Sequence, residues 1–208
     1  MSNSNYLPRG VFNFLICALV GVAVAIFFSA ASCIELIPLQ NINPTVLMIG
    51  CFVAALAGAF MASSSRNTVV QIIGFTLVPI ALGIMSRQWL YAVDGQVLYE
   101  AMLMTAAAVA IMAILSAMFP NFFMRISGIL IISLLVIIVV SLVGLFVAGF
   151  DYTWINAISL LVFMGLLGVD FVIARNSPPT VSIAIAISVS MFLDIINILM
   201  NITSLTDD

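Results

Sequence analysis

Seven apolar stretches, each long enough to cross a bilayer as a helix, divide the sequence. A spanning helix needs about 20 apolar residues, and only helices or closed barrels satisfy every backbone group inside lipid. The chain is 65% hydrophobic and 6% charged, whereas a soluble domain carries about 25% charged residues. We therefore predict an all-α membrane protein, a single integral-membrane domain over residues 1–208, with spans at 11–32, 44–64, 68–89, 99–119, 122–148, 153–174 and 180–205.

The charged residues between these spans are distributed unevenly. Arginines predominate on one side of the predicted membrane, at Arg9, Arg66, Arg125 and Arg175, and only Arg87 falls on the other side. The side of Arg87 also holds most of the acidic residues between spans, which are Glu35, Asp94, Asp151, Asp207 and Asp208. Because cytoplasmic loops carry an excess of Lys and Arg, we predict a cytoplasmic N-terminus and an outer C-terminus.

The last apolar stretch carries an aspartate, Asp194, near its middle. A charged side chain at the centre of a bilayer costs about 2.5 to 3.5 kcal/mol on insertion scales. Polar residues recur around it with helical spacing and therefore share one face, namely Ser190, Asp194, Asn197 and Asn201. A helix that faced lipid would not carry this stripe. We predict that the C-terminal helix lies at the centre of the bundle.

The best candidate partner of Asp194 is Asp170, late in the preceding stretch. Carboxylates inside membranes are usually functional, and two close carboxylates in low dielectric cannot both ionise cheaply, so they would share a proton. Alternatively, serines, asparagines or backbone groups satisfy each aspartate separately. Counted from the turn between the two stretches, the aspartates differ in depth by about 10 Å. Helix tilt, a distorted first turn of the last helix, or unwinding near Gly165 and Gly168 would have to close this gap.

Several function classes lack their usual residues in this sequence. There is no histidine, and the three cysteines form no Cys/His cluster, which argues against a zinc site. No nucleophile, base or metal constellation appears, so we expect no enzyme and no cofactor. Five scattered arginines and no lysine argue against nucleic-acid binding.

Residues 192–199 place a leucine and an aspartate before two apolar residues and an asparagine. This pattern resembles the Bax inhibitor-1 (transmembrane Bax inhibitor motif) family in its bacterial form. Asp170 stands where such members carry an acidic residue, and the seven spans agree. The resemblance implies a bundle wrapped around the last helix and a pH-sensitive calcium-leak channel. Asp170 and Asp194 would be its pH sensor and gate and would contact calcium, and Arg66 would pair with Asp170 as a latch.

Other functions stay open beside the channel. The protein could be a regulatory partner of a membrane-bound protease or of a stress or cell-death pathway, or a proton-coupled transporter of a small solute. Arg66 could equally be a loop arginine that only sets topology. We expect the lipid bilayer and calcium, as permeant ion, to be the main partners, and the bacterial inner membrane to be the location.

The arginine asymmetry yields a test of topology. A reporter fused after Asp208 is expected to be active only outside the cytoplasm, because an odd number of spans puts the two termini on opposite sides. Activity of that fusion in the cytoplasm would rule out the predicted orientation.

Overall fold

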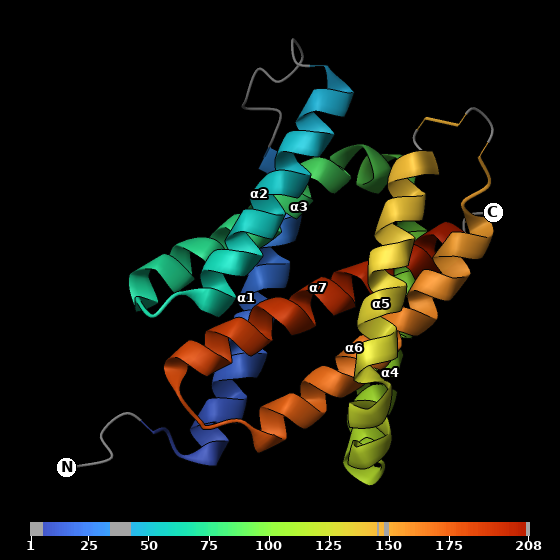
Figure 1. The fold of residues 1–208 in the computed structure, drawn as a ribbon. Coiled ribbons are helices and arrows are strands. Elements are labelled where there is room, and N and C mark those ends of the chain that lie inside the picture. The colour runs from blue at the N-terminus through green and yellow to red at the C-terminus, as the bar shows by residue number, and fades with distance from the viewer. Residues whose placement is uncertain (1–5, 34–42, 145, 148–149, 207–208) are drawn as a thin grey trace. The chain divides into compact units, whose positions relative to one another are not determined.

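The computed structural model describes residues 6–33, 43–144, 146–147 and 150–206. Within these ranges the chain forms seven α-helices and no strand (Figure 1), and each helix is long and apolar enough to cross a bilayer. The all-α class and the seven spans are confirmed, and the chain is a multi-pass integral membrane protein. The helices are α1 (Arg9–Cys33), α2 (Pro44–Ser64), α3 (Thr68–Ala92), α4 (Gly95–Met118), α5 (Pro120–Gly144), α6 (Thr153–Asn176) and α7 (Val181–Thr206).

Polar side chains just before the helices fix where most of them begin. Each accepts a hydrogen bond from a backbone N–H two or three residues further on, which satisfies one of the unpaired donors of the first turn. Asp94 accepts from the backbone N–H of Gln96 at 2.7 Å, and α4 therefore begins at Gly95, four residues before the predicted start. The capping side chains are Asn43, Asn67, Asp94, Asp151 and Thr180, for α2, α3, α4, α6 and α7.

The predicted end of the fifth span at residue 148 is wrong. Helix α5 ends at Gly144 and a turn follows, although residue 148 itself lies outside the described residues, as do Glu35, Asp207 and Asp208. A Cβ atom at position 144 would lie 2.7 Å from the hydroxyl oxygen of Tyr152. The chain therefore folds back against a position that only glycine can occupy without a shift.

The helices form two compact units that share α7. Unit 1 comprises α1, α2, α3 and the part of α7 up to Phe192, and unit 2 comprises α4, α5, α6 and the part of α7 from Leu193. No side chain of α7 between Ser182 and Leu205 is exposed. The predicted central position of this helix and the predicted single domain both stay predictions.

In unit 1, α3 packs against α1 and α2 through small residues. Gly74 faces α2 so closely that a Cβ atom there would lie 2.5 Å from the backbone oxygen of Gly58. The Gln71 side chain is 1% exposed, and its Nε2 donates to the backbone oxygen of Ala62 at 3.1 Å and to the Ser182 hydroxyl at 2.8 Å. One buried amide thus joins α2, α3 and the first turn of α7.

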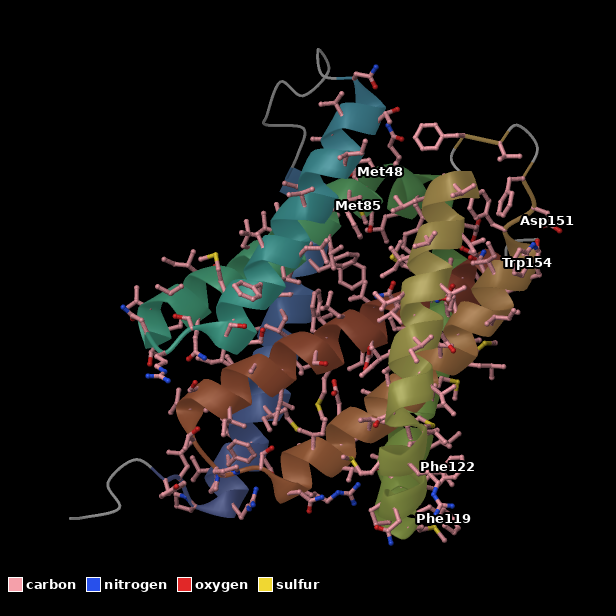
Figure 2. The ribbon with its side chains drawn as sticks, in the orientation of Figure 1. Met48, Met85, Phe119, Phe122, Asp151 and Trp154 are labelled. Carbon is pink, nitrogen blue, oxygen red and sulfur yellow. The ribbon has the colours of Figure 1, made fainter. Side chains whose placement is uncertain are left out.

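In unit 2, α6 packs against both α4 and α5, and α5 presents most of its surface outward. Figure 2 shows Phe119 and Phe122 at one end of α5 and Asp151 and Trp154 near the other. The three aromatic side chains are about half exposed, as in the aromatic belts at the two membrane–water interfaces. The apolar surface of α5 lies between these two ends.

The close contact at Gly74 predicts a cost for any side chain at that position. We expect Gly74→Ala to lower stability by about 1 to 3 kcal/mol, because overpacking forces backbone shifts. Gly50→Ala, in α2, is the matched control, since a Cβ atom there meets nothing within 4 Å. Thermal unfolding of both variants in detergent measures the difference, and equal stabilities would contradict this packing.

Candidate functional site

Unit 2 brings Asp170 of α6 and Asp194 of α7 within electrostatic range of each other. Asp194 is 5% exposed, and its Oδ2 atom is buried without a hydrogen-bond partner among the described residues. Asp170 is half-buried, and its Oδ2 atom is buried as well. A buried polar atom without a partner loses its interaction with water uncompensated. Asp194 is therefore a site with unused capacity to bind a proton, a water molecule or a cation.

A hydrogen bond joins the two helices that carry the aspartates. The Nδ2 atom of Asn201 on α7 donates to the hydroxyl oxygen of Ser159 on α6 at 3.1 Å. Counting 1.5 Å per residue in opposite directions from this bond gives an expected offset of about 6 Å along the helix axes between Asp170 and Asp194. Counting from the turn predicted about 10 Å, and this larger offset stays a prediction.

No unwinding of α6 is needed to bring the aspartates together. The helix is continuous from Thr153 to Asn176, so the suggested opening near Gly165 and Gly168 does not occur. These glycines instead admit α5, since a Cβ atom at Gly168 would overlap the ring of Phe123 and one at Gly165 would lie 2.9 Å from the Leu130 side chain. Close packing by α5 thus covers the turn of α6 just before Asp170.

The polar stripe of α7 is largely satisfied apart from Asp194. Asn197 donates through Nδ2 to the backbone oxygen of Leu193 at 2.7 Å. Asn201 donates through Nδ2 to the backbone oxygen of Asn197 at 2.7 Å as well as to Ser159. Ser190 is half-buried and lies in the part of α7 that belongs to unit 1. The stripe is therefore continuous along the helix, but its members have different roles.

A family model supports the family that residues 192–199 suggested. The model described as inhibitor of apoptosis-promoting Bax1 matches residues 4–207, nearly the whole chain. The chain belongs to the Bax inhibitor family. None of the curated proteins matches it. The family match confirms the resemblance but assigns no role to any single residue.

The predicted latch of this Bax inhibitor family member is not tested by the described contacts. Arg66 is exposed in the turn between α2 and α3, two residues after the end of α2. It lies in unit 1, whereas Asp170 lies in unit 2. The pairing of Arg66 with Asp170 stays a prediction.

Two polar contacts of unit 2 were not predicted from the sequence. Ser159 is 5% exposed and bonds Asn201, and its position eleven residues before Asp170 puts both on one face of α6, which was the available signal. Arg175, for which the sequence predicted only an effect on topology, donates through Nη2 to the hydroxyl oxygen of Ser116 on α4 at 2.6 Å. No sequence pattern links those two residues, because they lie on different helices.

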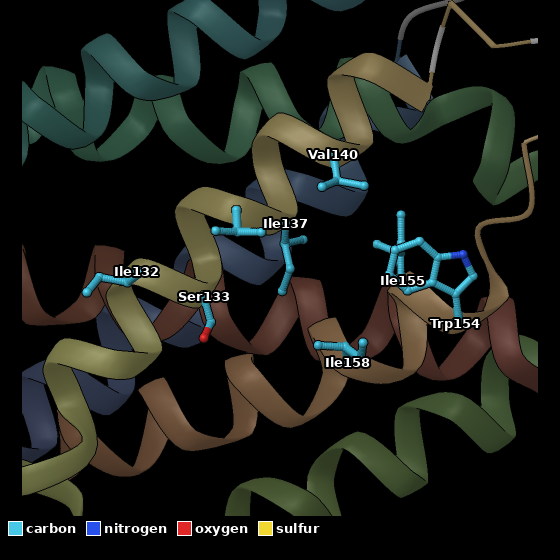
Figure 3. A pocket seen from close by; sticks show the side chains of 8 residues that line it. Ile132, Ser133, Ile137, Val140, Trp154, Ile155 and Ile158 are labelled. Atoms are coloured by element: carbon cyan, nitrogen blue, oxygen red, sulfur yellow. The ribbon is translucent and has the colours of Figure 1, made fainter.

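An apolar groove between α5 and α6 does not contain the aspartates. Its volume is about 220 Å³, and Figure 3 shows Ile137 and Val140 of α5 across from Ile155, Ile158 and Trp154 of α6. No charged side chain lines this groove, so it suits hydrocarbon rather than an ion. Nor do three or more His, Cys, Asp or Glu side chains cluster anywhere in the described ranges, so a cation at the aspartates would need further oxygen ligands.

Proposed function

We propose that the protein is a pH-sensitive calcium-leak channel of the Bax inhibitor type, in which Asp170 and Asp194 share a proton and act as sensor and gate. The observation that carries the proposal is the buried Asp194 carboxylate, whose Oδ2 atom has no hydrogen-bond partner in the described structure and which feels the charge of Asp170. Family membership supports the same function class.

The proposed gate follows from the electrostatics of two carboxylates in low dielectric. With one shared proton the pair carries a single charge and a hydrogen bond, which is the closed state. As pH rises the proton leaves, and the two like charges repel each other strongly because the surroundings screen them poorly. A cation that reaches the site relieves this repulsion.

Calcium suits such a site because it prefers oxygen ligands, although it takes about six to eight of them. Asp170 and Asp194 would supply some, and the amide oxygen of Asn197, backbone carbonyls or water would supply the rest. Asn197 lies one helical turn beyond Asp194, which places it within reach of an ion at the pair. Calcium here is the ion that passes, not a resident cofactor.

Other titratable groups do not account for a response near neutral pH. The sequence has no histidine. Hydrogen bonds from Thr153 hold the pKa of the exposed Asp151 below its usual value of 3.8, so this group stays ionised at neutral pH. The remaining charged side chains described in unit 2 lie toward helix ends and are Asp94, Glu100, Arg125 and Arg175. We therefore assign the proposed neutral-range response to the aspartate pair.

The proposal includes location and partners. We place the protein in a bacterial inner membrane with the N-terminus in the cytoplasm, and we propose that it is not an enzyme. A regulator of a membrane protease and a proton-coupled transporter are the competing functions. Purified protein in liposomes separates them, since a regulator passes no calcium and a transporter moves solute against a gradient when protons flow.

The gate is tested by calcium flux against pH in liposomes for the wild type, Asp170→Asn, Asp194→Asn and the double variant. Asp194→Asn should lose most of the pH dependence and pass calcium more slowly, because an amide neither titrates nor attracts the cation. Asp170→Asn should behave similarly, and the double variant should add little, since coupled sites are not additive. Two independent, additive effects would contradict a shared proton.

The latch is tested by Arg66→Ala. If Arg66 pairs with Asp170 in the closed state, its loss should raise basal flux. Exposed ion pairs contribute about 0 to 1 kcal/mol, so the expected increase is up to about fivefold. Arg125→Ala, which removes an exposed arginine from the same predicted side of the membrane, is the control and should leave flux unchanged. Equal flux in both variants would leave Arg66 as a topology residue.

A further inference from the structure

The hydrogen bond between Ser159 and Asn201 joins α6 and α7 deep within unit 2. Ser159 is 5% exposed and Asn201 is 8% exposed. The Nδ2 group of Asn201 donates two hydrogen bonds, one to the Ser159 hydroxyl at 3.1 Å and one to the backbone oxygen of Asn197 at 2.7 Å. The amide is thereby held in one orientation across the seam between the two helices.

This bond lies on the same helix faces as the aspartates. Ser159 precedes Asp170 by eleven residues, about three turns, and Asn201 follows Asp194 by seven residues, about two turns. The bond is therefore displaced from the aspartates along one seam, by about 10 Å along α7 and about 16 Å along α6. It lies toward the C-terminal end of α7, which is the outer end in the predicted topology.

The side chains around the bond are apolar. Ile155 and Val162 flank Ser159 on its face of α6, and Ile198 precedes Asn201 by one turn of α7. All three side chains are at least nine-tenths buried. The titratable and charged groups described on the helices of unit 2, besides the aspartate pair, are Asp94, Tyr99, Glu100, Arg125, Asp151, Tyr152 and Arg175. None lies within one helical turn of Ser159 or Asn201 along the chain. The bond is thus a neutral polar contact, with the buried Ile155, Val162 and Ile198 within about one turn of its two residues along the helices.

We propose that the Ser159–Asn201 hydrogen bond is the outer constriction of the ion path, closed in the described structure. This inference rests on the proposed channel function. A neutral hydrogen bond between membrane helices has a modest net value, because the separated groups find other partners, so it can break when the helices shift. Once separated, the hydroxyl and the amide present oxygen atoms to a partly dehydrated cation, whereas an apolar pair would leave a dry barrier.

The constriction predicts that closing and pH sensing are separable. Ser159→Ala removes the acceptor and should raise calcium flux several-fold under acidic, closing conditions, while the pH of half-maximal flux stays that of the wild type because both aspartates remain. Thr203→Val is the matched control. Thr203 is 0% exposed and donates to the backbone oxygen of Leu199 within α7 at 2.8 Å, so its loss removes a buried hydroxyl without touching the seam.

A merely structural role would give a different result. Ser159→Ala and Thr203→Val would then lower the unfolding temperature to a similar extent and leave closed-state flux at the wild-type level. That outcome would overturn the constriction and leave the aspartate gate standing. Asn201→Ala, which removes the other partner without filling its space, should raise closed-state flux if Ser159→Ala does, and disagreement between them would also count against the bond.

A second measurement does not depend on calcium. Ser159→Cys is introduced after the native Cys17, Cys33 and Cys51 are replaced by serine, and the full chain in vesicles is treated with a water-soluble thiol reagent. Labelling should be faster in alkaline than in acidic buffer, and Asp194→Asn should abolish the difference. Thr203→Cys in the same background is the control.

The two measurements separate the two proposals. Negligible, pH-independent labelling of position 159 in a protein that conducts calcium would overturn the constriction alone. If labelling of position 159 depends on pH but the protein conducts no calcium, the hydrated path would be supported and calcium as the permeant ion would be overturned. Absence of both labelling and conduction would overturn the constriction and the channel together.

Discussion

A carboxylate removed from water is the constraint on which unit 2 depends. Asp194 is 5% exposed in the middle of a spanning helix, where a charge has no solvent to screen it. The helix places the aspartate on a face where Asn197 and Asn201 are hydrogen-bonded, and α6 supplies a second carboxylate within electrostatic range. Two acids in such a place repel each other when both are ionised. Their placement is unfavourable for stability alone, which is why it indicates a function.

Glycines on α6 leave room for large apolar side chains of α5 near Asp170. Gly168 leaves room for the Phe123 ring of α5 two residues before Asp170, and Gly165 leaves room for Leu130 one turn earlier. These contacts bring α5 close against α6 over the turn that precedes Asp170. In unit 1, the absence of a side chain at Gly74 likewise lets α2 pack closely against α3. Close approach is the usual basis of helix association in lipid, where no hydrophobic effect drives helices together.

The sequence predicted the elements of this fold better than their contacts. Seven spans were predictable because the bilayer dictates length and composition, and the acidic residues were evident because they are rare in such stretches. Partners on other helices were not. Gln71 and Ser159 look like ordinary polar residues in apolar runs, and only the packing of helices shows that Gln71 joins three of them and that Ser159 meets Asn201. The depth of Asp170 relative to Asp194 also depends on how α6 and α7 are aligned, because counting from the Ser159–Asn201 bond instead of the turn lowers the expected offset from about 10 Å to about 6 Å.

The Asp170–Asp194 pair can respond to pH directly, whereas the neutral Ser159–Asn201 pair cannot. In the proposed gate, the interaction between Asp170 and Asp194 changes from attraction to repulsion when the shared proton leaves, and low dielectric enlarges that change. The bond between Ser159 and Asn201 involves no titratable group, so pH reaches it only through movement of α6 against α7. A seam with both kinds of contact can therefore assign sensing to one pair and closure to the other. In the proposed channel, a shift that separates the aspartates would be carried by the continuous helix α7 to Asn201, about two turns beyond Asp194.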